Sequence, residues 1–195
     1  MRSIEKKELI ISWITISVAF ASVWSGIFQF DEFIHFLPIS FVAVGTGFIF
    51  HELAHRTVAK HYGCLAEFRM WKEGLILALV LPIITFGRFF FAAPGAVYIY
   101  GPHLTRRENG IISLAGPLTN TIVAIVFLTI LFLLPNTLMF PYVKDLCLGV
   151  AHLNLWFAFF NLIPIPPLDG SKVISWNPIV WGLAFFPLFI LFFLI

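Results

Sequence analysis

Long apolar runs separated by short polar segments dominate the pattern of this chain. A helix needs about 20 predominantly apolar residues to cross a bilayer, and five runs come close to or exceed that length. The predicted spanning helices are Leu9–Phe30, Phe36–Tyr62, Ile111–Leu134, Asp145–Ile163 and Pro178–Ile195. The first run exceeds the apolar core of a cleaved signal peptide, which has about 7–15 residues. We therefore expect it to be retained as a signal anchor.

A sixth apolar region, Leu75–Tyr100, is interrupted by residues that break helices. These are Pro82, Gly87, Arg88, Pro94 and Gly95. We predict a short helix over Leu75–Phe86, followed by an extended stretch over Phe89–Tyr100. Non-helical backbone at membrane depth must be buried in protein or line a wet cavity. The predicted fold class is therefore an all-α polytopic membrane protein. It has about six hydrophobic helices and a short re-entrant extended segment between the second and third full spans.

Composition supports a membrane protein. Of the 195 residues, 60% are hydrophobic and only 11% are charged, whereas soluble domains carry about 25% charged residues. Lipid must therefore be the solvent for most of the chain, which we treat as a single membrane-embedded domain, residues 1–195. The formal net charge of +2 says nothing by itself about partners. We expect a lipid bilayer as partner and no nucleic acid.

The positions of lysine and arginine predict the orientation, because cytosolic loops carry an excess of them. With a cytosolic N-terminus, only Lys144 of the 12 Lys and Arg residues lies clearly on the outer side. This holds only if Leu75–Tyr100 enters and leaves on the same face. We therefore predict a multi-pass protein of the cell membrane, with its N-terminus and the opening of any functional site on the cytosolic side.

Two histidines and a glutamate lie within the second predicted span. His51 and His55 are four residues apart, so a helix places both imidazoles on one face, with Glu52 beside that face. This is the H-E-x-x-H pattern, in which two imidazoles hold zinc and the glutamate acts on its bound water. The alternative is that each histidine forms a hydrogen bond with a neighbouring helix. Three ionisable groups at this spacing in an apolar helix favour a metal site, because each is costly in hydrocarbon.

A catalytic zinc site typically has three protein ligands, so a third must come from another part of the chain. Asp169 is the candidate, because it follows the fourth span on the side where the second span ends. The prolines between residues 164 and 167 stop the preceding helix and force an extended approach. The alternative for this segment is an interfacial turn with Asp169 in water.

Together these residues resemble the site-2 protease family of intramembrane zinc metalloproteases. The resemblance covers the core from about Phe36 to Lys172. The matching pieces are His51-Glu52-Leu53-Ala54-His55, Val58-Ala59-Lys60, Tyr62-Gly63, Ala115-Gly116-Pro117 and Asn161-x-x-Pro164-x-x-Pro167-x-Asp169-Gly170. One departure is Ser171, which stands where the family frequently has a second glycine.

The resemblance implies a metalloendopeptidase that cleaves transmembrane segments of single-pass membrane proteins. It implies that His51, His55 and Asp169 bind one zinc ion per chain and that Glu52 is the catalytic base. It also suggests that Asn161 helps to bind substrate or to stabilise the developing oxyanion. A structural role for Asn161 is an equal alternative.

Other polar groups are left open by the sequence. Asn154, on the same helix as Asn161, is a second candidate for the oxyanion or for a structural bond, and His152 is expected to form a bond between helices. The stretch Phe89–Tyr100 either pairs with an unwound substrate as an added strand or only packs the helices as a wedge.

Two further functions compete with proteolysis. A membrane zinc-binding or zinc-transport protein would use the same ligands, but would need ionisable residues along a path through several helices. An inactive relative that holds a partner helix is disfavoured, because every expected catalytic residue is present.

Overall fold

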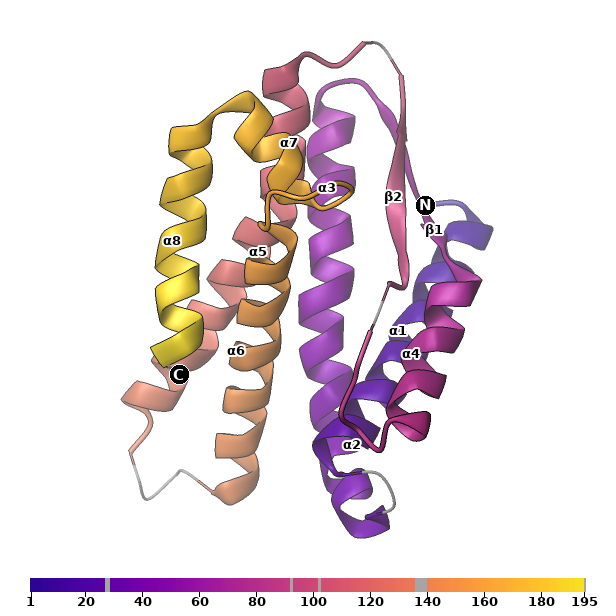
Figure 1. Ribbon diagram of the computed structural model, residues 1–195, viewed down its shortest axis with the longest axis vertical. Helices are drawn as coiled ribbons and strands as arrows, with labels where there is room; N and C mark the ends of the chain where they lie inside the picture. The colour runs from indigo at the N-terminus through magenta and orange to yellow at the C-terminus, as the bar shows by residue number, and fades with distance from the viewer. Residues whose placement is uncertain (27–28, 92, 102, 136–139, 195) are drawn as a thin grey trace.

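A computed structural model gives the fold, and it describes residues 1–195 except 27–28, 92, 102, 136–139 and 195. The described residues form eight α-helices, one π-helical turn and two strands (Figure 1). The helices are α1 (Ser3–Trp24), α2 (Phe30–Val44), α3 (Phe50–His61), α4 (Lys72–Ile84), α5 (Arg106–Leu133), α6 (Pro141–Asn161), α7 (Asp169–Trp176) and α8 (Pro178–Leu194). The π-helical turn η1 (Gly45–Ile49) joins α2 to α3, and the strands are β1 (Leu65–Met70) and β2 (Gly95–Tyr100).

In the described part of the chain, four helices are long and apolar enough to cross a membrane. They are α1, the continuous helix Phe30–His61 formed by α2, η1 and α3, then α5 and α6. The fifth predicted span corresponds to α8, which is apolar but has only 17 residues. A mostly helical membrane-type fold is thus confirmed in outline. Residues 27–28, 92 and 195, which belong to three predicted segments, lie outside the described part of the chain.

Five helices, α1, α2, α4, α5 and α6, begin earlier than predicted, and two of them show why. Helix α1 begins at Ser3, six residues before the apolar run, because its charged first turns still form helix. Helix α5 begins at Arg106, five residues before Ile111, because Thr105 and Glu108 form a reciprocal capping box. Such a box satisfies backbone donors that the first turn leaves unpaired. Apolarity therefore located these helices but not their first residues.

Helix α3 ends in a glycine-dependent turn directly after the H-E-x-x-H segment. Gly63 has a φ of +76°, a conformation that glycine adopts without steric cost. The N–H of Gly63 donates to the carbonyl of Lys60, and the N–H of Cys64 donates to the carbonyl of Ala59. These two bonds form a Schellman motif. The motif turns the chain from α3 into β1.

Strands β1 and β2 form an antiparallel hairpin, with α4 in the connection between them. Leu65 pairs with Tyr100 and Met70 pairs with Gly95. The chain therefore returns beside the point from which it left, and re-entry on one membrane face stays a prediction. The helix begins three residues before the predicted Leu75, and the strand covers only the second half of the predicted extended stretch. Strand β1 was not predicted.

The two edges of this hairpin differ. On the outer edge of β1, the N–H of Phe68 donates to Glu5 Oε1 at 3.3 Å, and the N–H of Met70 donates to Glu8 Oε2 at 3.2 Å. Directly opposed residues in antiparallel pairs alternate between bonded and non-bonded. Phe68 therefore belongs to a non-bonded pair, and its partner Val97 turns its own backbone N–H and C=O away from β1. Among the described residues no third strand covers that outer edge of β2.

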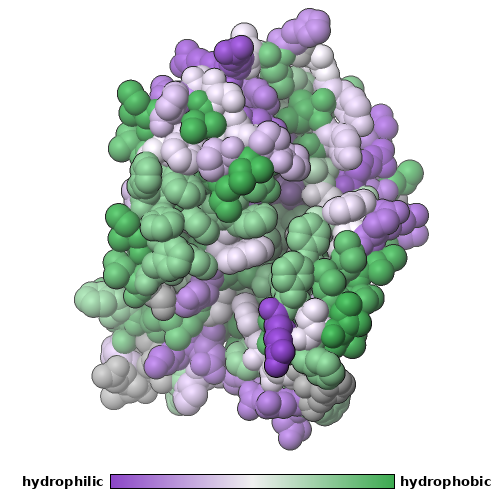
Figure 2. All heavy atoms as spheres, in the orientation of Figure 1, coloured by the Kyte–Doolittle hydropathy of each residue, from purple (hydrophilic) through white to green (hydrophobic). Residues whose placement is uncertain are grey.

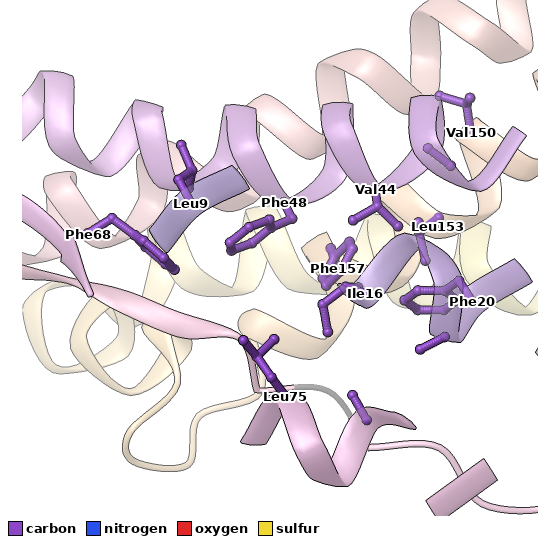
Figure 3. Packing of buried hydrophobic residues seen from close by; sticks show 13 residues of the cluster. Leu9, Ile16, Phe20, Val44, Phe48, Phe68, Leu75, Val150, Leu153 and Phe157 are labelled. Atoms are coloured by element: carbon purple, nitrogen blue, oxygen red, sulfur yellow. The ribbon is translucent and has the colours of Figure 1, made fainter. Parts of the chain in front are cut away.

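The largest apolar cluster joins the hairpin to the helices (Figure 3). Its labelled side chains come from α1, α2, η1, β1, α4 and α6. A second cluster joins α5, α6, α7 and α8. On the face shown in Figure 2, hydrophilic residues lie mainly toward the two ends of the long axis, and hydrophobic residues dominate between them. This distribution suits a molecule whose middle faces lipid.

Candidate metal centre

Three residues from two distant segments meet at one point. The Nε2 atoms of His51 and His55, one turn apart on α3, lie 2.9 Å from each other. Asp169, the first residue of α7, places Oδ2 at 3.4 Å from Nε2 of His51 and 3.1 Å from Nε2 of His55. The three side chains are largely buried. The structure therefore brings together the three ligands proposed from the sequence.

A non-helical segment carries Asp169 to α3. Helix α6 ends at Asn161, and the proline-rich residues 162–168 connect it to α7. The indole N–H of Trp181 donates to the carbonyl of Leu162 at 2.8 Å and fixes the start of this connection. A β-carbon on Gly170 would collide with that same carbonyl group. Glycine beside Asp169 thus allows the two ends of the connection to pack closely.

The second nitrogen of each imidazole has an acceptor. His55 Nδ1 donates to the backbone carbonyl of Ile112 at 2.7 Å, and His51 Nδ1 donates to Asn120 Oδ1 at 2.5 Å. Neutral imidazoles protonated at Nδ1 present only lone pairs at Nε2. Two such lone pairs and one carboxylate oxygen therefore face one another, an arrangement that a positive ion between them would stabilise.

The donor set fits zinc. Zinc takes imidazole nitrogen and carboxylate oxygen, and a catalytic site uses three protein ligands and leaves one position for water. His51, His55 and Asp169 each offer one ligand atom, and these atoms lie within 4.8 Å of one another. Outer partners such as Asn120 and the Ile112 carbonyl orient the imidazoles, as they do around bound metals in general.

Helix α5 approaches the centre through a glycine. A β-carbon on Gly116 would lie 2.5 Å from Nε2 of His55 and 2.6 Å from Nε2 of His51. Real β-carbons essentially never come so close to a neighbour. Gly116 therefore keeps open the space in which the imidazole nitrogens converge. This explains the glycine in the Ala115-Gly116-Pro117 segment.

The charged groups around Asp169 also suit the binding of a cation. Without a metal ion, burial would raise the pKa of this carboxyl, but the imidazoles of His55 and His51, when they carry a proton on Nε2, outweigh burial and hold the pKa well below its usual range. Lys172 Nζ lies 3.5 Å from the other oxygen, Oδ1. Asp169 is therefore an anion with one oxygen facing the imidazoles and the other facing a lysine.

The metal centre opens into a cavity of about 670 Å³ between α3 and the hairpin. Its lining includes Glu52, Val97, Ile99, Asn161 and Lys172 together with the three ligands. The Oε2 atom of Glu52 is buried and has no hydrogen-bond partner among the described residues. A buried oxygen without a partner is costly. Its position beside the ligands is suited to binding a water molecule that reacts there.

The two asparagines of α6 are in different situations. Asn161 lines the cavity, and its Nδ2 donates to the Phe157 carbonyl at 2.9 Å. Asn154 is completely buried, and its Nδ2 donates to Thr46 Oγ1 and to the Val150 carbonyl. Its amide does not line the cavity. The suggestion that Asn154 stabilises the oxyanion was therefore wrong.

The remaining histidines lie apart from the centre. His35 Nε2 is 3.0 Å from Asp145 Oδ2, which fits a bond at the edge of a span. His152 was expected to bond a neighbouring helix, but its side chain is exposed and has no hydrogen-bond partner among the described residues. Neither residue contributes to the cavity around His51.

Sequence reasoning missed three residues of the centre. Asn120 holds His51, Gly116 clears space for both imidazoles, and Lys172 lies beside Asp169. Asn120 carried a usable signal, because a polar residue in the middle of an apolar span is costly and needs a partner. The contact with His51 depends on how α3 and α5 pack, which the pattern along one helix does not contain.

Several known proteins are similar to this chain. "Putative zinc metalloprotease MJ0611" of Methanocaldococcus jannaschii is 50% identical over 166 residues, which cover 83% of each chain. "Putative zinc metalloprotease YwhC" of Bacillus subtilis is 27% identical over 168 residues, 74% of this chain and 73% of the relative. "Zinc metalloprotease MJ0392" of Methanocaldococcus jannaschii is 31% identical over 140 residues, 71% of this chain but only 34% of the relative.

No family model matches the chain, and no solved structure matches it significantly. The similarity to MJ0611 nevertheless extends over most of both sequences. By this similarity, the chain belongs to a family of zinc metalloproteases.

Proposed function

We propose that this protein is an intramembrane zinc metalloprotease of the site-2 type, which cleaves transmembrane segments of single-pass membrane proteins. The observation that carries the proposal is the convergence of two buried imidazole nitrogens and one carboxylate oxygen. They meet at a cavity in a chain whose described residues include four helices long and apolar enough to span a membrane. His51, His55 and Asp169 hold one zinc ion per chain.

Glu52 is the proposed catalytic base. When bound, zinc lowers the pKa of a coordinated water to about 7 and polarises a carbonyl group. The carboxylate of Glu52 accepts a proton from the attacking water and transfers it to the leaving nitrogen. Its unpartnered buried oxygen supports this role.

Asn161 is the proposed substrate ligand. It lines the cavity beside Asp169, and only one of its two amide protons is needed for the bond to the Phe157 carbonyl. The second N–H lies in the same amide plane and would donate a hydrogen bond to a substrate carbonyl oxygen or to its oxyanion. A role confined to capping the end of α6 is the alternative.

The outer edge of β2 is the proposed binding site for the substrate backbone. A transmembrane helix must unwind before its peptide bonds react, and its freed backbone groups then need new partners. Val97 lines the cavity and turns its backbone groups away from β1. An unwound segment that pairs with this edge, as an added strand, would lie beside Glu52. The alternative is a hairpin that only packs the helices.

The proposed orientation places the N-terminus and the cavity on the cytosolic side of the cell membrane. Positively charged residues support it, because Arg2, Arg56, Lys60, Arg106 and Lys172 all lie near helix ends that adjoin the hairpin and the metal centre. Cytosolic loops carry an excess of such residues. Water would then reach the centre from the cytosol.

Zinc transport without proteolysis is the competing function. It would need further groups of ligands along a path through the helices. In the described part of the chain, His51, His55 and Asp169 form the one group of this kind. This favours a fixed site over a path.

The proposal is tested with the purified protein in liposomes. Zinc is measured by mass spectrometry after a chelator wash, and a panel of single-span substrates is incubated with wild-type protein and with Glu52→Gln. We expect about one zinc per chain in both proteins and cleavage only in the wild type. Zinc flux across the liposomes that survives in Glu52→Gln, without any cleavage by the wild type, would favour transport.

A further inference from the structure

A chain of hydrogen bonds runs from His51 away from the cavity into the protein interior. His51 Nδ1 contacts Asn120 Oδ1, and Asn120 Nδ2 donates to the carbonyl of Gly47 at 2.7 Å and to Asn154 Oδ1 at 3.0 Å. Asn120 and Asn154 are both completely buried. The chain links α3, α5, α6 and the π-helical turn η1. We call it the amide relay.

Backbone carbonyls fix the direction of the relay. A carbonyl can only accept, so the Gly47 carbonyl requires the amide nitrogen of Asn120 and leaves Asn120 Oδ1 facing His51. In the same way the Val150 carbonyl, 2.9 Å from Asn154 Nδ2, requires the nitrogen of that amide. Asn154 Oδ1 is thereby presented to Asn120. Neither amide can be flipped without placing two acceptors against each other.

At the far end of the relay, too, every donor is matched with an acceptor. Thr46 Oγ1 accepts from Asn154 Nδ2 at 3.0 Å, and its own proton is used by the carbonyls of Val42 and Ala43 at 2.9 and 3.0 Å. Every donor in the relay therefore points toward an acceptor. A buried polar network is stable when all its members are satisfied in this way.

We infer that Asn120 and Asn154 are positioning residues that hold the proton of His51 on Nδ1 and so present its Nε2 lone pair to the metal. A neutral imidazole has one proton for two nitrogens. Because Asn120 Oδ1 is an acceptor, it stabilises the form protonated at Nδ1. The inference deepens the proposed function and depends on the metal site described above.

His55 provides an internal reference for this inference. Its Nδ1 donates to the backbone carbonyl of Ile112, which no side-chain substitution removes. A change that breaks the amide relay should therefore affect the proton position on His51 and leave that on His55 unchanged. A general loosening of the fold would affect both.

The first measurement uses nitrogen NMR of the zinc-free protein labelled at histidine. It is made at alkaline pH, where imidazoles are neutral. In the wild type we expect His51 and His55 both to be protonated at Nδ1. A wild-type His51 protonated at Nε2 overturns the inference without the need for any variant.

The second measurement compares variants. Asn120→Leu keeps a similar volume and removes the acceptor, so we expect a mixture of proton positions on His51 only. Zinc affinity, measured by competition with a chelator, should fall about 10–100-fold, the usual cost of losing an outer partner of a metal ligand. Asn154→Leu should give the same change to a smaller degree.

Thr46→Val is the matched control. It removes one bond at the end of the relay but leaves the bond from Asn154 to the Val150 carbonyl, which fixes the direction. We expect its zinc affinity and its His51 signal to match the wild type. Unchanged zinc affinity and an unchanged His51 signal in Asn120→Leu would show that the amides are structural only.

The two proposals fail in different ways. If the wild type binds zinc and cleaves substrates but Asn120→Leu does so equally well, the relay is wrong and the protease stands. If the relay fixes His51 as expected but the wild type binds no zinc, the protease is wrong and the relay stands. If Asn120→Leu does not fold, Asn154→Leu and the wild-type signal decide the question.

Discussion

The cavity has two walls that are built differently. The helical wall carries His51, His55 and Asp169, whose polar atoms have partners and are held in place. The hairpin wall presents the outer edge of β2, which no third strand covers in the described residues. Side chains that are already fixed by hydrogen bonds are suited to binding a small ion, because an ion needs its ligands in a fixed geometry. A backbone edge without a third strand is suited to an extended peptide, which can pair with it as a further strand.

The largest effect on cleavage should come from the helical wall. In Asp169→Asn the metal centre loses its only anionic ligand atom, so we expect zinc to be removed by a chelator wash and cleavage to fall to background. Zinc content by mass spectrometry and a cleavage assay measure the two losses. Full zinc content together with normal cleavage would show that Asp169 is not a ligand.

The hairpin wall is tested by removing one backbone donor. Proline at position 97 lacks the N–H that Val97 turns away from β1, so Val97→Pro should lose nearly all cleavage while retaining zinc. Val97→Ala keeps the N–H and is the control, with cleavage expected within a few fold of wild type. Normal cleavage by Val97→Pro would favour a hairpin that only packs the helices.

A smaller effect is expected where α5 meets the helical wall. The β-carbon of Gly116→Ala would overlap Nε2 of both histidines, so the imidazoles must move apart. We expect zinc affinity to fall about 10–100-fold, the scale of other disturbances around a metal ligand. Gly182→Ala on α8 places its β-carbon in ordinary contact, at 3.6 Å, and should behave as wild type.

The smallest effect on cleavage should come from the closed edge of the hairpin. Glu5 is buried, binds Arg56 at 2.8 Å and accepts from the N–H of Phe68. Glu5→Gln removes the charge from this bond, and we expect a loss of about 1–3 kcal/mol in the free energy of unfolding. Cleavage at low temperature should change little. A large loss of cleavage without a loss of stability would mean that both edges serve the substrate.

The sequence predicted which side chains meet at the candidate metal centre better than it predicted their surroundings. His51 and His55 are found from helical spacing alone, and Asp169 from its place after a proline-rich segment. Asn120 and Asn154 could not be paired with His51, because their contacts depend on the packing of three helices. Residues that can bind a metal are recognised from a short stretch of sequence. The residues that orient them come from distant segments and are recognised only once the helices are packed.

The same distinction holds for the fold. Apolar runs located the long helices, but Thr105 and Glu108 set the true start of α5 through a capping box that apolarity does not reveal. Strand β1 is short and mixes charged with apolar residues, so it carries little pattern of its own. Its existence follows from pairing with β2 and from the carboxylates of α1.

The π-helical turn η1 sets the rotational phase between the two halves of one long helix. Each residue of a regular helix rotates the chain by about 100°, and a π turn accommodates an additional residue without ending the helix. Regular α-helical winding of the same residues would instead rotate the two imidazoles of α3 by about that angle, away from α7. The π turn thus decides which face of the long helix His51 and His55 occupy.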